Sequence, residues 1–173
     1  MLLEVEQLIK NTPVLTKQNL FLLLNKKKDA ADYWMKKLVK SGVLIKLKSG
    51  VYAPRYYVDL VSQNPNDKTM YLEYLANVLR SPSYISLEYV LSKKNIMAES
   101  VFKITSVTTK STRAYETELG TFLYRQIKPD LFTGYQNIIW RDKQIREATP
   151  EKAMADLRYL NKGLDTSRFN YAN

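Results

Sequence analysis

The hydrophobic positions of the first sixty residues change their period near residue 42. Before that point they recur every three to four residues, as in amphipathic helices, and after it they alternate with polar residues, as in a strand. The pattern predicts a helix from residue 2 to about residue 11, a second over 16–24 and a third over 29–41. A hairpin is predicted over 43–53, turning at Ser49-Gly50.

Capping and breaking residues place the ends of these helices. Thr16 and Asp29 are expected to cap the second and third helices, because a short polar side chain can accept the free N–H groups of a first turn. The basic turn 25–28 ends the second helix, in which Leu20, Leu23 and Leu24 are expected to be buried, and Gly42 ends the third.

The third helix has an apolar face and a basic face. Ala31, Met35 and Leu38 share the inward side at the 3.6-residue period. The opposite side carries Asp32, Tyr33, Lys36, Lys37 and Lys40. Two helices, a short turn and a basic hairpin are the outline of a winged helix-turn-helix, in which the second helix of the pair enters the major groove.

The hairpin adds further positive charge. Lys46 and Lys48 are two residues apart, so they are expected to share one face of the strand and to meet backbone phosphates, together with Arg55. Lys28 completes the set of residues that we expect to contact DNA. A lysine-rich face is also an ordinary solvated surface, and it is the order of the elements that favours DNA binding.

The second half of the chain predicts an α+β domain with an antiparallel sheet. A polar segment, Ser62–Lys68, is interpreted as a linker between a domain at 1–61 and one at 69–173. Helices are expected over 69–80, over 86–94 with Ser86 as cap, and from Pro150 with Thr149 as cap. Strands are expected over 102–109, 113–118, 121–127 and 138–140.

Composition narrows the classes of function. The 173 residues carry a net charge of +10 and contain neither cysteine nor histidine, which excludes disulfides, thiolate or imidazole metal sites and triads built on these residues. Residues 1–58 hold 11 Lys and Arg against 4 Asp and Glu, so a polyanionic partner is expected for this half. Acidic residues interrupt the apolar N-terminus, unlike a signal peptide, and we expect a soluble, cytoplasmic protein without a membrane partner, metal or cofactor.

Two further hypotheses concern the second domain. Lys110, Arg113, Arg125 and Lys128 surround a predicted hairpin and form either a second DNA contact or a surface for an acidic partner; alternatively they pair across strands with acids such as Glu116 and Glu118. Those two glutamates with Asp130 and Lys128 could in principle form a magnesium-dependent nuclease site. Their spacing matches no such motif, and we expect no enzyme. A third alternative is a winged helix used only for protein interaction.

Five short strings occur in an order that resembles the AbiEi antitoxin family. They are PSYISL from Pro82, TSVT from Thr105, GTF from Gly120, KP from Lys128 and PEKA from Pro150. The resemblance spans nearly all of residues 15–160. The family comprises transcriptional regulators of two-gene abortive-infection toxin–antitoxin systems.

The resemblance implies a function for each domain. The winged helix would bind inverted repeats in the promoter, as double-stranded DNA, and repress the operon. The larger C-terminal domain would counteract a nucleotidyltransferase-type toxin. Direct contact with that toxin is a hypothesis.

Overall fold

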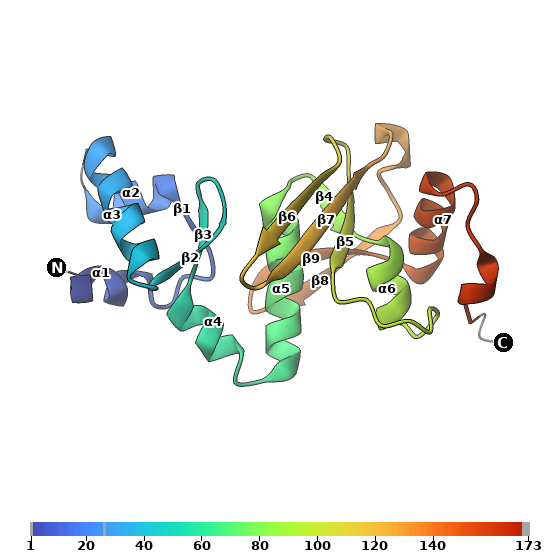
Figure 1. The fold of residues 1–173 in the computed structure, drawn as a ribbon, viewed down its shortest axis with the longest axis horizontal. Helices are drawn as coiled ribbons and strands as arrows, with labels where there is room; N and C mark the ends of the chain where they lie inside the picture. Colours follow the sequence, from blue (N-terminus) through green and yellow to red (C-terminus); the bar gives the residue numbers. More distant parts are fainter. Residues whose placement is uncertain (1, 26, 171–173) are drawn as a thin grey trace. The chain divides into compact units, whose positions relative to one another are not determined.

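The chain is a mixed α and β protein that divides into two compact units. The computed structural model describes residues 2–25 and 27–170, except for the side chains of Leu2 and Lys28. Unit 1 runs to Tyr71 and unit 2 begins at Leu72. Figure 1 shows the elements of both units. No helix within the described ranges is both long and apolar enough to cross a membrane.

Unit 1 consists of short helices around a small antiparallel sheet. The sheet has the strand order β1-β3-β2. The elements are α1 (Leu2–Ile9), β1 (Leu15–Thr16), α2 (Lys17–Leu24), α3 (Lys28–Lys40), β2 (Leu44–Lys48), β3 (Val51–Pro54) and α4 (Arg55–Val61). The core contains apolar residues from α1, α2, α3 and the sheet, namely Val5, Ile9, Leu15, Leu20, Met35, Leu38 and Leu44.

The predicted start of α2 is confirmed. The Thr16 hydroxyl accepts from the Asn19 N–H, and the Asn19 side chain accepts from the Thr16 N–H, which together form a capping box. Asn25 ends the helix in the left-handed conformation. The predicted burial of Leu23 is wrong, since its exposed fraction is 42%. The core lies on the side of Leu20 and Leu24, and Leu23 is turned away from it.

The third predicted helix begins earlier than expected. Lys27 occupies the cap position of α3, and Asp29 lies in its first turn. The assignment of Asp29 as the cap is therefore wrong. A carboxylate in the first turn still interacts favourably with the positive end of the helix dipole. The predicted end holds, because α3 finishes at Lys40 and Gly42 has a φ of +81°.

The predicted hairpin forms, with Gly50 at a φ of +78° in its turn. Its ladder contains a bulge, however, because Lys46 lies opposite Tyr52 while Lys48 lies opposite Val51. Burial still alternates at this point, since Lys46 is exposed, Leu47 is buried and Lys48 is half-buried. The shared strand face of Lys46 and Lys48 therefore stays a prediction.

The segment 62–68, interpreted as a linker, is largely helical. α5 (Pro65–Leu79) begins inside it and continues across the boundary between the units. The Asn64 side chain accepts from the N–H groups of Asn66 and Asp67, and a proline suits the first helical position. In unit 1 the Tyr71 hydroxyl donates to the Pro13 carbonyl at 2.6 Å.

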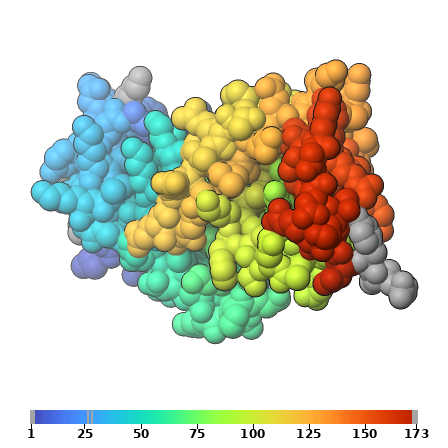
Figure 2. Space-filling model, turned by 45° about the vertical axis from the view of Figure 1, so that its right-hand side comes forward, coloured from blue at the N-terminus to red at the C-terminus, as the bar shows by residue number. Residues whose placement is uncertain are grey.

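Unit 2 is built on a six-stranded sheet with the order β6-β7-β5-β4-β9-β8. Its elements are β4 (Ser83–Ile85), α6 (Leu87–Lys93), β5 (Ile104–Thr108), β6 (Arg113–Thr117), β7 (Gly120–Gln126), η1 (Pro129–Leu131), β8 (Tyr135–Trp140), β9 (Lys143–Ala148), α7 (Pro150–Leu160) and η2 (Thr166–Arg168). The predicted antiparallel sheet is wrong, because β5 pairs with β7 and β4 pairs with β9 in parallel. Figure 2 shows α7 and the residues after it, in red, at the surface.

Helices pack on both faces of this sheet. The Tyr124 hydroxyl donates to the Ala76 carbonyl of α5. On the neighbouring strand Thr105, which lies opposite Leu123, accepts from the Tyr89 N–H of α6. Since consecutive residues of a strand point to opposite faces, α5 and α6 lie on different sides of the sheet.

A buried carboxylate joins α7 to β4. Asp156 accepts from the hydroxyls of Tyr84 and Ser86 at 2.8 Å and pairs with the Lys152 ammonium at 2.9 Å. The predicted cap Thr149 accepts from the Lys152 N–H, whereas Ser86 occupies the cap position of α6 without a capping bond from its side chain. The Ser86 hydroxyl binds Asp156 instead.

Candidate nucleic-acid interface

The outward face of α3 is basic and accessible. Tyr33, Lys36, Lys37 and Lys40 are all exposed, Tyr33 to 60% of its area. On the opposite side Ala31, Met35 and Leu38 are buried, as predicted. The helix has 13 residues, so it is about 20 Å long. An α-helix with its side chains is about 10 to 12 Å in diameter, which fits the major groove of about 12 Å.

Aromatic rings hold one of these lysines in place. The Lys37 ammonium lies 4.9 Å from the centre of the Trp34 ring and 5.9 Å from that of Tyr33. The two rings meet edge to face, and Trp34 is only 6% exposed. A cation above an aromatic face is attracted by the ring quadrupole. The buried indole therefore orders the side chain of Lys37 on the exposed face.

Asp32 has a role that its position in the sequence does not indicate. Its carboxylate pairs with the ammonium of Lys17, the first residue of α2. Both side chains are about two-fifths exposed, so the pair contributes at most about 1 kcal/mol to stability. The pair joins α2 to α3 and leaves the lysines as the positive groups of the outward face.

The lysines of the hairpin differ in accessibility. Lys46 is exposed on β2, whereas Lys48, beyond the bulge, is half-buried. Lys46 is therefore the better placed of the two for a phosphate contact. The side chain of Lys28, which was also predicted to contact DNA, lies outside the described residues.

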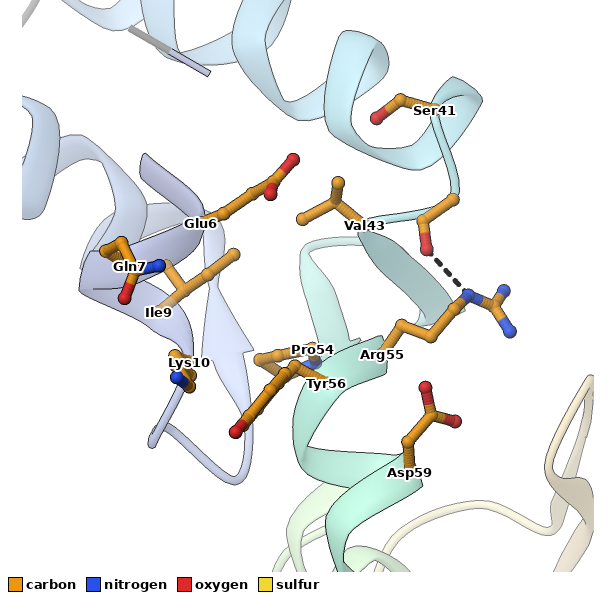
Figure 3. Close-up of a pocket in the computed structure, with 11 residues that line it drawn as sticks. Glu6, Gln7, Ile9, Lys10, Ser41, Val43, Pro54, Arg55, Tyr56 and Asp59 are labelled. Atoms are coloured by element: carbon orange, nitrogen blue, oxygen red, sulfur yellow. Dashed lines mark hydrogen bonds between the residues drawn. The ribbon is translucent and has the colours of Figure 1, made fainter. Parts of the chain in front are cut away.

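The Arg55 side chain forms a hydrogen bond within unit 1. Its Nε donates to the Gly42 carbonyl at 2.6 Å, and Figure 3 shows the side chain reaching from the start of α4 to the turn after α3. The last carbonyls of a helix and its turn need such donors. This contact gives Arg55 a structural role beside the predicted phosphate contact.

Arg55 also lines a pocket of about 310 Å³ in unit 1. α1 contributes Glu6, the turn after it contributes Lys10, and α4 contributes Tyr56 and Asp59 (Figure 3). The Lys10 ammonium lies 4.6 Å from the centre of the Tyr56 ring. Acidic and basic groups are mixed in this lining, which suits neither a phosphate nor a cation in particular.

In unit 2 the four predicted basic residues do not form one site. Arg113 and Arg125 line a pocket of about 410 Å³ between β6, β7 and the start of α6, together with Glu88. The Arg113 guanidinium lies 5.3 Å from the centre of the Tyr115 ring. Lys110 and Lys128 are exposed and lie outside the lining of this pocket.

A cluster of buried charge lies elsewhere in unit 2. The Lys93 ammonium binds Glu73 at 2.9 Å and Glu147 at 2.7 Å, and both glutamates are fully buried. Burial lowers the pKa of Lys93, but the charges and hydrogen bonds of the two carboxylates outweigh burial and raise it overall. Sequence reasoning missed this cluster, because three residues so distant along the chain carry no shared motif.

The acids considered for a nuclease site are not brought together. Glu116, Glu118 and Asp130 are exposed. Within the described ranges, no three acidic side chains are grouped so that they could hold a metal ion.

No protein-family model matches the chain, and no curated protein matches its sequence.

Proposed function

We propose that unit 1 is a winged helix-turn-helix that binds double-stranded DNA. The observation that carries the proposal is the exposed face of α3, where Tyr33, Lys36, Lys37 and Lys40 lie together on the second helix of a pair. α3 would lie in the major groove and read bases from its N-terminal half. The hairpin, through Lys46, would contact the phosphate backbone.

The electrostatics of unit 1 support this proposal. The acid on the outward face, Asp32, is paired with Lys17, so the field of the face is set by its lysines. The excess of positive charge in residues 1–58 would attract DNA before contact. Such binding releases counterions and weakens steeply as salt rises.

The binding mode can be tested on the full chain with two double variants of equal charge. Replacing Lys36 and Lys40 with alanine should weaken DNA binding and flatten the salt slope by about two units, since each phosphate contact contributes about one. The control replaces Lys103 and Lys162, which are exposed in unit 2. If both double variants lose affinity equally, α3 is not the interface, and only net charge matters.

We further propose that the protein represses its own operon and acts as the antitoxin of a nucleotidyltransferase-type toxin. The ordered strings that resemble the AbiEi family support this proposal. We assign no catalysis to the chain. Co-expressing the chain with the product of its neighbouring gene should restore growth, and incubating it with plasmid and magnesium should leave the plasmid intact. Failure to rescue, or cleavage of the plasmid, would overturn the respective assignment.

A protein-interaction module is the competing proposal for unit 1. It predicts that no DNA is bound at any salt concentration, and the same titration therefore separates the two proposals.

A further inference from the structure

The outer strand β8 is the least protected edge of unit 2. It is the last strand in the order β6-β7-β5-β4-β9-β8, so within the described part of the chain one side of it has no neighbouring strand. Its six residues, YQNIIW, include no charged residue and no proline. The opposite edge, β6, carries the exposed charges Arg113 and Glu116. Charges on an edge strand discourage pairing with another chain, and β8 lacks this protection.

The backbone of β8 is oriented for pairing. Its turn to β9 consists of Arg141 and Asp142, with φ values of 46° and 62°, and Trp140 lies opposite Lys143. In a two-residue hairpin the residues beside the turn are hydrogen-bonded to each other, and such pairs alternate along the ladder. The backbone groups of Tyr135, Asn137 and Ile139 therefore point toward the open side.

The side chains of those three residues lie on one face of the strand. Ile139 is 69% exposed and Asn137 is exposed. Tyr135 is half-buried and stacks on the Tyr84 ring with centres 5.0 Å apart. The strand thus offers an exposed β-branched residue and a fixed aromatic ring, separated by one small polar side chain.

We propose that β8 pairs antiparallel with β8 of a second copy of this chain, centred on Asn137. In this register Asn137 lies opposite Asn137 of the second copy, and Tyr135 lies opposite Ile139 of the second copy. Aromatic and β-branched residues form favourable cross-strand pairs, so the exposed Ile139 gains a partner. Two six-stranded sheets then join into one continuous sheet around a two-fold axis.

The sequence of β8 favours a second copy as the occupant of this edge, because the strand is complementary to itself in this register. Two molecules of net charge +10 repel each other, and a like-charged pair across the new ladder would add to this cost. Because β8 carries no charge, every pair between Tyr135 and Ile139 in this register is neutral. Two identical copies of β8 can therefore pair without placing like charges opposite each other.

The register can be tested by charge exchange at the two-fold axis. In sedimentation velocity of the full chain, wild type should form a dimer, and Asn137→Lys and Asn137→Asp should each weaken it about fivefold through like charges placed opposite each other. An equimolar mixture of the two variants should restore the dimer. Ala114→Lys, at an exposed position of β6, is the matched control and should not change it. Far-UV circular dichroism checks that each variant is folded.

A cross-link gives a second readout. The chain contains no cysteine, so Asn137→Cys introduces the only thiol. The Cα atoms of a hydrogen-bonded antiparallel pair lie about 5.5 Å apart, within the range of a disulfide. Oxidation should yield a covalent dimer from Asn137→Cys and much less from Ala114→Cys. Three results would overturn the proposal. The wild type could remain monomeric up to about 10⁻⁴ M, or Asn137→Lys and Asn137→Asp could each dimerise as strongly as the wild type. The equimolar mixture of the two variants could also fail to form a dimer.

Discussion

At the scale of single residues, Asp156 connects more of unit 2 than any motif in the sequence suggests. Its carboxylate is 3% exposed and binds two hydroxyls from the region of β4 and one ammonium from its own helix. Lys152 also donates to the Leu131 carbonyl at 2.8 Å, which extends the network to η1. Residues of the strings PSYISL and PEKA, far apart along the chain, therefore meet in one buried polar network.

Replacing Asp156 with alanine should destabilise the protein by about 3 to 5 kcal/mol, because the Lys152 charge and two buried hydroxyls lose their acceptor. Urea unfolding followed by circular dichroism measures the change. Glu151→Ala is the matched control on the same helix, at an exposed position, and should cost no more than about 0.5 kcal/mol. Equal losses for the two variants would show that the network contributes nothing specific.

Three tyrosines of unit 2 should make the protein sensitive to alkali. Burial raises the pKa of Tyr84, Tyr89 and Tyr124 far above the usual value near 10, and the carboxylates Asp156 and Glu73 raise the pKa of the first two further. These hydroxyls ionise in the unfolded chain near pH 10 but stay protonated in the folded one. Their contribution to stability is therefore complete below pH 10 and is lost as the pH rises above it.

Absorbance of tyrosinate and far-UV circular dichroism, recorded together during an alkaline titration, test this expectation. Part of the tyrosinate signal should appear only as the helical signal disappears. Tyr84→Phe should weaken the dependence of the unfolding free energy on pH above 10, since one linked proton is removed. Complete ionisation of all 13 tyrosines in a folded protein would contradict the expectation.

At the scale of elements, a helix or strand could be predicted where its hydrophobic residues recur at a clear period and a capping or turn residue marks its end. α2 with its Thr16 cap, the β2–β3 hairpin, strands β5 to β7 and α7 with its Thr149 cap are all confirmed within a few residues. The exposed lysines of α3 were predictable for the same reason, since they follow from the period of its apolar face.

Elements whose burial is set by distant neighbours could not be predicted. β4 has only three residues, all buried, and therefore no alternation. β9 reads KQIREA, and its Glu147 points inward because Lys93 of α6 neutralises it there. The parallel pairing of β4 with β9 leaves no local signal either. In unit 1 the ion pair between Lys17 and Asp32 and the hydrogen bond from Arg55 to the Gly42 carbonyl likewise have no local signal in the sequence.

Substitutions of two neighbouring aromatic residues of α3 should have different effects, one on the stability of the protein and the other on DNA recognition. Trp34 is buried, so Trp34→Ala should cost about 3 to 5 kcal/mol of unfolding free energy. Tyr33 is 60% exposed, so Tyr33→Ala should barely change stability but should reduce preference for operator over random DNA by about 1 to 3 kcal/mol. Thermal melts and fluorescence anisotropy on both DNAs measure the two effects. An equal loss of affinity on both DNAs would reassign Tyr33 to a backbone contact.

At the scale of the whole molecule, α5 is the element that belongs to both units. The boundary between the units falls after Tyr71, inside this helix, and not in the polar segment before it. Tyr71 is fully buried, and its ring lies 5.3 Å from that of Tyr57. The stability of the proposed DNA-binding unit therefore depends on a residue that lies beyond residues 1–61.

Two fragments should reveal this dependence. A fragment of residues 1–74 keeps Tyr71 with its bond to the Pro13 carbonyl, whereas a fragment of residues 1–61 loses both. A domain of about sixty residues is marginal, and losing a large buried aromatic side chain costs about 3 to 5 kcal/mol. The longer fragment should melt cooperatively and bind DNA, and the shorter one should be largely unfolded. Tyr71→Ala in the longer fragment should reproduce the defect, and a shorter fragment of equal stability would show that the unit is complete before α5 begins.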